Sequence, residues 1–389
     1  LCTPARASLF TGLYSHNNDV GFNLRRDSIL DQASIYPTIG KSFKQAGYNI
    51  AYFGKEHAGG YGYASATEFG SMVHSDGGML AEGSAYDPIF TQDAIDYVNN
   101  SVDDKPFFMT LSLINPHDIC RVLGGKVAGA TFTDAIHFAR NDDEPYLRFQ
   151  DRPNLPENHN STYEKGMILH KDFMYYEVFG LNENEWKRFI STYQLLIENT
   201  DRLIGQLLAS VKQKGIDDNT IIVFTTDHGE MAGSHKLIAK TTFYEESSKI
   251  PVIIRYPKEI KQSITNSDAM VSTIDIMPTL LDLAGVEIPK GIDGRSFKKQ
   301  ILESEVSTNE FDIVFSQNQF GRMVRYDQFK YVRSVVYGIT YEILYDIDND
   351  PNESKNLIDD PKFKNQLIKG RKLLDDWLVN EGTELIVER

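Results

Sequence analysis

Short apolar runs alternate with stretches of helical periodicity along the first two thirds of the chain. The runs are almost wholly apolar, which is typical of strands that a sheet buries on both faces. The strands predicted in this way are 48–53, 107–114, 220–226 and 251–256. The helices predicted around them are 4–13, 37–46, 87–101 and 184–214. This alternation predicts an α/β fold, with a mostly parallel central sheet sandwiched by helices.

Two of the predicted helices carry further local signals. Gly47 follows the helix at 37–46 and is typical of the residue just past a helix end. The helix at 184–214 has an apolar face, which we expect to be buried. That face consists of Trp186, Phe189, Ile190, Tyr193, Leu196 and Ile197.

The pattern changes after about residue 305, where short strand-like runs follow one another through turns. These runs are 312–317, 322–334 and 341–347, and a closing helix is predicted at 361–381. We therefore expect a large domain over 1–305 and a small C-terminal α+β subdomain over 306–389.

Residues 118–180 are irregular and polar, and they are rich in Asp, Asn, His and Arg. A stretch of this length is too long for a passive connection inside a compact domain. We expect it to be an elaboration that faces a substrate.

Composition narrows the range of partners. The chain has 389 residues and a net charge of −15, from 40 basic and 55 acidic residues. An acidic surface argues against nucleic acid or an anionic membrane as the main partner. No apolar run approaches the ~20 residues of a membrane span. The two cysteines, Cys2 and Cys120, cannot form a disulfide framework.

Polar clusters follow three of the predicted strands. Lys55 and His57 come after the first, and His117 comes after the second. The third is followed by Asp227, His228, His235 and Lys240. Each cluster alone is also compatible with a solvated turn. Ligands bind at the carboxyl ends of strands in open α/β sheets. Because polar side chains follow three strands in the same way, they indicate one shared site.

The cations of this site favour a tetrahedral oxyanion such as sulfate or phosphate. Lys55, Lys240 and Arg6 supply fixed positive charge. A helix that starts near Pro4 would add backbone N–H groups at its N-terminus. Cys2 lies at that N-terminus, where the pKa of a thiol is lowered. It reads either as a nucleophile or as a small residue packed in a turn.

Four short motifs resemble the signatures of the type I sulfatases. CTPAR (2–6), continuing to Thr11 and Gly12, resembles the C-x-P-x-R-x4-T-G element, with Ala5 where serine is often found. The other matching elements are DHGE (227–230) with Gly233, His235 and Lys240, then GKEH (54–57), and Pro116-His117. The tail at 344–357 is also similar to sulfatase C-termini.

The resemblance implies a fold of the alkaline phosphatase superfamily, with the sulfatase catalytic domain over 1–305. It further implies that a formylglycine-generating or anaerobic sulfatase-maturating enzyme oxidises Cys2 to formylglycine. One hydroxyl of the aldehyde hydrate would attack sulfur, and the other would then expel sulfate as the aldehyde reforms. A plain thiol would lack that internal exit.

The resemblance also implies roles for the surrounding side chains. Arg6 would hold the hydrate, while Lys55 and Lys240 would bind the sulfate oxygens. His117 would protonate the leaving alcohol, and His57 would orient or deprotonate the hydrate.

A divalent cation would be held by Cys2, Asp227 and His228. Calcium is favoured, because family members with Asn at the second position usually carry it. This chain has His228 at that position, and since imidazole is a softer ligand, manganese and magnesium are alternatives. Two further metal ligands of the family are consecutive aspartates upstream of the cysteine motif. The sequence starts one residue before that motif, so either these aspartates lie upstream of Leu1, or the chain is a fragment that lacks them.

Two residues have open roles. Asp118 is either a contact to a sugar hydroxyl or amine, or a turn residue. His235 could support a metal ligand, contact the substrate or lie on a helix surface.

The sequence therefore predicts a sulfuric ester hydrolase that acts on a sulfated sugar or oligosaccharide, in the periplasm or secreted. One alternative is a phosphonate or phosphate ester hydrolase of the same superfamily. The other is a non-catalytic protein that binds sulfated glycans.

Overall fold

A computed structural model describes residues 1–21, 35–58, 72–73, 82–100, 105–120, 153–167, 181–260, 265, 269–302 and 311–380. The helices are α1 (Cys2–Thr11), α2 (Ile39–Gln45), α4 (Glu82–Asn100), α7 (Glu183–Gln213), α8 (Glu245–Ser248), α9 (Ile276–Leu283), α10 (Lys298–Leu302) and α11 (Lys364–Asn380). The strands are β1 (Asn49–Lys55), β2 (Met72–Val73), β3 (Phe107–Ser112), β4 (Ile222–Thr225), β5 (Val252–Arg255), β6 (Ile313–Gln317), β7 (Gly321–Tyr326), β8 (Phe329–Val336) and β9 (Ile339–Asp346). Single 3₁₀ turns are η3 (Lys165–Met167), η4 (Asp217–Asn219), η5 (Ser234–Lys236), η6 (Thr273–Asp275) and η8 (Pro361–Phe363).

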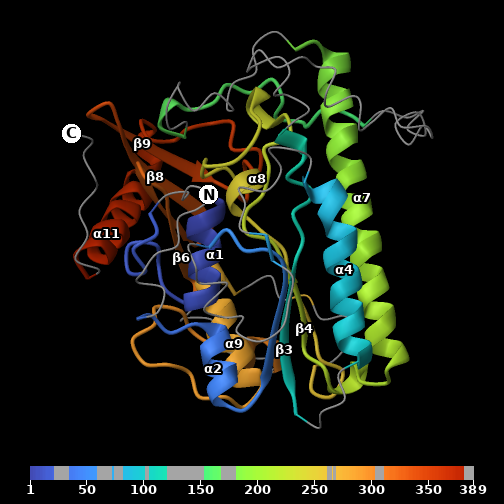
Figure 1. Cartoon of the computed structure of the whole chain (residues 1–389). Helices are drawn as coiled ribbons and strands as arrows, with labels where there is room; N and C mark the ends of the chain where they lie inside the picture. Colours follow the sequence, from blue (N-terminus) through green and yellow to red (C-terminus); the bar gives the residue numbers. More distant parts are fainter. Residues whose placement is uncertain are drawn as a thin grey trace.

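Strand β1 is buried on both faces, as its apolar sequence predicts. It pairs in parallel with β2 and β3 in the order β2-β1-β3. Ile50 and Tyr52 pack against α1, α2 and α9, whereas Ala51 and Phe53 pack against α4. Successive strand residues point to opposite faces, so one apolar run serves two helical layers. Figure 1 shows these layers, with α4 and α7 side by side on one flank and α1, α2 and α9 on the other.

The α/β fold with helices on both faces is confirmed, with a local difference at β4 and β5. These two strands pair antiparallel, with Val223 opposite Ile254. The parallel arrangement therefore applies to β1, β2 and β3 among the described strands.

Helix α7 follows the predicted helix closely, but one residue of its expected face is exposed. Trp186, Phe189, Ile190 and Leu196 are buried, whereas Ile197 is 44% exposed. Beyond Leu196 the inward positions continue through residues such as Leu203, because an apolar stripe drifts around a straight helix. Ile197 is thereby left at the margin of the stripe.

The C-terminal part forms an antiparallel sheet in the order β6-β7-β8-β9, covered on one face by α11. Its other face packs on the segment that follows β4. Met323, Val332 and Ile343 there contact Phe243 and other residues of that segment. The predicted short strands and closing helix are confirmed, whereas the predicted boundary at 305/306 lies outside the described residues.

Most of the irregular region also lies outside the described residues, apart from 118–120 and 153–167. Over the described ranges, no helix combines the length and the apolar character that crossing a membrane requires.

Candidate functional site

Cys2 is the first residue of α1 and is 1% exposed. The first N–H groups of a helix have no partner inside the helix and carry partial positive charge. Sγ of Cys2 lies 3.2 Å from Nε2 of His228, which follows β4. The ring of His117, which follows β3, also hydrogen-bonds the thiol. A helix start and two strand ends therefore meet at Cys2.

Arg6 connects α1 by hydrogen bonds to the ends of three strands. Its Nε donates to Oδ2 of Asp227 over 2.9 Å. One terminal nitrogen donates to the carbonyl of Lys55 over 3.2 Å and to Oγ of Ser112 over 2.7 Å. These partners stand at the ends of β1, β3 and β4, so one guanidinium joins three strands. The resemblance implies a contact of Arg6 with the nucleophile, and the structure adds this bridging role.

Asp227 and His228 direct one oxygen and one nitrogen toward Cys2. Nδ1 of His228 lies 2.8 Å from the carbonyl of Gly229. Because a carbonyl only accepts, Nδ1 carries the hydrogen, and in the neutral ring Nε2 keeps a lone pair. Oδ1 of Asp227 lies 3.7 Å from that Nε2. Burial raises the pKa of Asp227, but the His228 ring and Arg6 outweigh it and hold the pKa well below its usual range.

These residues fit a divalent cation. The ligand atoms of Cys2, Asp227 and His228 all lie within 4.8 Å of one another. A thiolate, an imidazole and a carboxylate together favour a softer metal. If an oxygen group replaced the sulfur at position 2, the donor set would shift toward harder cations.

Gly229 lets another segment approach this corner. A side-chain carbon at Gly229 would lie 1.9 Å from the carbonyl oxygen of Glu246 in α8. The glycine N–H instead donates to the carbonyl of Ser247 over 2.9 Å. The glycine of the DHGE motif is therefore required by close packing of α8 against the site.

Positive charge surrounds Cys2. Burial raises the pKa of its thiol, but Lys240, Lys55 and His228, with the hydrogen bond from His117, outweigh it and bring the pKa well below its ordinary value. Lys55 is 2% exposed, and burial lowers its pKa. Burial also lowers the pKa of Lys240, yet Cys2, Cys120 and the nearby acidic groups raise it above its ordinary value. The charges of both predicted lysines thus lower the pKa of the same group, the Cys2 thiol.

Two further histidines of the prediction, His57 and His117, lie beside the nucleophile position. His57 is buried, and its Nε2 lies 3.1 Å from Oγ1 of Thr3, the neighbour of Cys2. Burial, together with the charges of Lys55 and Lys240, lowers the pKa of His117 to about 3. These surroundings therefore favour the neutral form of His117 near pH 7.

Two buried carboxylates hold the turn that carries His117. Asp87 of α4 accepts from the N–H groups of Ile114 and Asn115 at 2.7 and 2.9 Å. In return, Asp118 accepts from the N–H groups of Gly83 and Ser84, in the first turn of α4, at 3.1 and 2.8 Å. Asp118 also accepts from Oγ of Ser84 over 2.8 Å. Of the two interpretations of Asp118, the structure favours a structural role in the turn over a sugar contact.

His235 lies away from the cation-rich cluster. It belongs to η5, is 1% exposed, and stacks on Tyr244 with ring centroids 4.1 Å apart. Backbone groups of Thr162 and Asn352 lie near its ring and, with Glu246, oppose the lowering of its pKa by burial. A helix-surface position is excluded by this burial, and the residue contributes to packing between the 153–167 segment and the C-terminal part.

Sequence reasoning missed three supporting residues: Ser112, Thr3 and Asp87. Asp87 carried a usable signal, because it falls on the stripe of α4 that also holds Phe90, Ala94 and Val98. An acidic residue on an apolar stripe needs a buried partner. Ser112 and Thr3 gave no such signal, since small hydroxyl residues are common at strand ends and in first helical turns.

Comparisons with known families match nearly the whole chain. The family model described as Sulfatase matches residues 1–286, and the model described as N-sulphoglucosamine sulphohydrolase, C-terminal, matches residues 233–377. The second match overlaps the first across the segment that carries Lys240.

Individual relatives agree with these matches. A Delta 4,5-hexuronate-2-O-sulfatase of Bacteroides thetaiotaomicron is 27% identical over 97% of this chain and 79% of its own length. A Multifunctional alkaline phosphatase superfamily protein of Trinickia caryophylli is 26% identical over 93% of this chain and 82% of its own length. A solved structure of a 2-O GAG sulfatase superposes with a TM-score of 0.80 and 26% identity, covering 100% of this chain and 85% of the other.

Proposed function

The chain belongs to the sulfatase family, and from this premise we propose that it hydrolyses the sulfate ester of a sugar with a nucleophile derived from Cys2. The observation that carries the proposal is the placement of Cys2. Its sulfur lies 3.2 Å from His228, at a helix start and under the charges of Lys55 and Lys240. That arrangement suits an anionic ester whose sulfur is attacked from the helix end.

Lys55 and Lys240 would hold the sulfate group in the proposed reaction. Their ammonium groups neutralise the anionic oxygens in the ground state and in the transition state. Arg6 keeps Asp227 ionised and in place, and so preserves the geometry on the other side of Cys2.

We propose that Cys2 is converted to formylglycine, whose aldehyde hydrate supplies an oxygen nucleophile and an internal route for sulfate release. Cys2, Asp227 and His228 would hold a divalent cation, for which we propose calcium, with manganese or magnesium as alternatives. Such a cation supplies Lewis acidity and withdraws charge from the sulfate oxygens.

His117 would act on the oxygen that leaves. Burial and the charges of Lys55 and Lys240 lower its pKa, and the negative charge of a bound sulfate ester would offset those lysines, so His117 would donate a proton to the leaving oxygen in the substrate complex. His57 lies against Thr3 and would orient the hydrate at position 2. In this proposal His117 assists departure of the alcohol, whereas His57 orients the nucleophile.

Sugar substrates are supported by two similar proteins, a Delta 4,5-hexuronate-2-O-sulfatase and a 2-O GAG sulfatase. Sulfated glycans lie outside the cytoplasm, so we propose that the protein works in the periplasm or is secreted. We also propose that it depends on a maturating enzyme for Cys2.

The proposal is tested by sulfate release from protein produced with a maturating enzyme and carrying confirmed formylglycine. Substrates are sulfated glycosaminoglycan and algal oligosaccharides, with matched aryl sulfate and aryl phosphodiester. Chelation should abolish turnover, and re-addition of calcium, manganese or magnesium should identify the metal that restores it.

Each alternative has its own outcome in that assay. Preference for the phosphodiester would favour the phosphonate or phosphate ester hydrolase. This outcome is included because the relative from Trinickia caryophylli is a multifunctional member of the alkaline phosphatase superfamily. Sugar binding without turnover by converted protein would favour the non-catalytic alternative. If converted protein neither hydrolyses any of these esters nor binds the sulfated sugars, the proposal is overturned.

A further inference from the structure

The backbone on both sides of Lys240 is strained. Ala239 has φ +65° and Thr241 has φ +81°, values that residues other than glycine rarely adopt. A β-branched residue such as threonine is especially disfavoured there. Such a conformation is unfavourable and persists only where surrounding contacts impose it. The N–H of Met231 donates to the carbonyl of Ala239 over 2.9 Å, and the position of Lys240 also depends on what holds the segment that follows it.

That hold comes from the C-terminal sheet through three polar contacts. Nδ2 of Asn318, in the turn after β6, donates to the carbonyl of Thr241 over 3.1 Å. Nζ of Lys330, on β8, donates to the carbonyl of Phe243 over 2.8 Å. Oε2 of Glu353, beyond β9, accepts from the N–H of Glu245 over 2.7 Å. The contacts thus fall on alternate residues, 241, 243 and 245, directly after Lys240.

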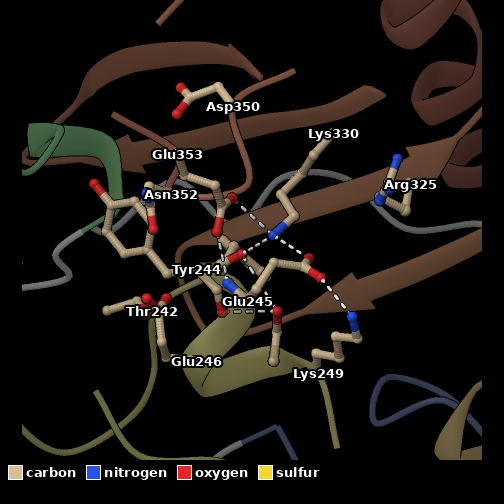
Figure 2. Close-up of polar contacts among 12 residues, drawn as sticks. Thr242, Tyr244, Glu245, Glu246, Lys249, Arg325, Lys330, Asp350, Asn352 and Glu353 are labelled. Atoms are coloured by element: carbon tan, nitrogen blue, oxygen red, sulfur yellow. Dashed lines mark hydrogen bonds and ion pairs between the residues drawn. The ribbon is translucent and has the colours of Figure 1, made fainter. Parts of the chain in front are cut away.

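Lys330 is the centre of this arrangement, as Figure 2 shows. Its side chain is 0% exposed. Besides the carbonyl of Phe243, Nζ contacts Oε1 of Glu353 at 2.8 Å and Oε1 of Glu245 at 2.6 Å. Three acceptors therefore match the three N–H groups of the ammonium.

A buried ion cluster of this kind is a poor source of net stability. Desolvation of the charges offsets much of their attraction, and apolar residues of similar volume often serve as well. The cluster does, however, specify one geometry, because a displaced Phe243 carbonyl would leave the buried ammonium short of an acceptor. The main effect of the cluster is therefore to fix the position of residues 241–245, rather than to raise the free energy of unfolding.

We propose that Lys330 is a positioning residue that acts through Lys240, with Glu353 and Asn318 as its partners. The C-terminal sheet thereby sets where the Lys240 ammonium stands relative to Cys2 and the sulfate group. The inference rests on the proposed function, which assigns sulfate binding to Lys240.

The test is a double-mutant cycle in matured protein, with Lys330→Met, Lys240→Ala and the double variant. For Lys330→Met we expect kcat/KM to fall by about 10- to 100-fold, because small misplacements of a binding group are costly. In the Lys240→Ala background, the same change should cost less than about 3-fold. An equal loss in both backgrounds would overturn the proposal, because a general structural defect would not depend on Lys240.

Calorimetric binding of inorganic sulfate provides a second readout that does not need turnover. The dissociation constant should rise in Lys330→Met and change little further when Lys240 is already removed. If wild-type protein hydrolyses no sulfate ester yet shows this coupling, the proposed function fails and the positioning role stands. If turnover occurs without coupling in either readout, the positioning role fails alone.

Two further variants keep the test decisive. Asn318→Asp keeps the oxygen that accepts from Phe320 and Gly321 but loses the donor to Thr241, so it perturbs the same segment if Lys330→Met does not fold. We expect the same dependence on Lys240, with about a 3- to 10-fold loss. Lys369→Met removes a half-exposed lysine paired with Asp327 and should leave kcat/KM unchanged.

Discussion

Arg6 and Asp227 stand 221 positions apart in the chain, and Nε of Arg6 donates to Oδ2 of Asp227 over 2.9 Å. This contact joins the helix that begins with Cys2 to the end of β4. It also occupies one carboxylate oxygen and leaves Oδ1 facing His228. The nucleophile position and the candidate metal corner are therefore mechanically linked.

Arg6→Lys should weaken both the fold and the activity. Lysine retains the charge but cannot reach Asp227, the Lys55 carbonyl and Ser112 with one planar fork. We expect the free energy of unfolding to fall by about 2–4 kcal/mol, because Asp227 stays mostly buried with fewer partners. Urea unfolding and sulfate release measure the two effects. Arg255→Lys, at a half-exposed pair with Asp217, should cost under about 0.5 kcal/mol, and an equal cost in both variants would contradict the prediction.

Cys2→Ala should abolish turnover, with a loss of about 10³-fold or more, because it removes the nucleophile. Cys120→Ala is the matched control, since it removes the other thiol of the chain and should retain activity. Intact-mass measurement on the active protein should show the conversion of one thiol to an aldehyde, and peptide mass mapping should locate it at Cys2 rather than at Cys120. Substantial activity in Cys2→Ala would rule out the nucleophile assignment.

Asp87 should make stability depend on pH. Burial raises its pKa to about 7, with a further increase from Asp118, although the N–H groups of Ile114 and Asn115 and the charge of Lys55 oppose the shift. An unfolded aspartate ionises near pH ~3.9, so between that pH and about 7 the folded state holds more protons. This group therefore lowers the free energy of unfolding as pH rises through that window, by up to about 1.4 kcal/mol per pH unit.

Asp87→Asn removes this titration. The stability of the variant relative to wild type should therefore increase from about pH 4 to about pH 7, and level off above. Chemical denaturation across the pH series measures the difference, and a flat difference would show that Asp87 ionises normally in the fold.

Gly54→Ala should be severely destabilising. Gly54 has φ +109°, and a side-chain carbon there would lie 2.0 Å from the carbonyl oxygen of Ser112 on the paired strand β3. We expect a loss on the order of 3 kcal/mol or more, from backbone strain and from displacement of the strand. Gly205→Ala, in α7 with open space around it, should instead add about 0.5–1 kcal/mol. Thermal denaturation of the two variants compares them directly, and similar melting temperatures would contradict the close approach at Gly54.

Local pattern predicted most of the elements but not all of their surroundings. The apolar run at 48–53 became β1 because burial on both faces demands apolar residues at every position. Ile197 was misplaced, because the apolar stripe drifts around the helix and leaves this residue at its margin. The antiparallel pairing of β4 with β5 was likewise not readable from composition, which is similar for both strand directions when strands are apolar.

The sequence by itself determined which chemical groups are available. The cysteine motif, the lysines and the Asp-His pair are contiguous in short motifs, so their order and spacing suffice to recognise them. Tertiary structure alone decided what each polar side chain does. Asp118 anchors α4, Arg6 bridges three strand ends, and Lys330 lies buried under the segment that carries Lys240. The physical reason is that a polar group must find a partner once it is buried, and that partner comes from whichever distant segment the fold brings alongside.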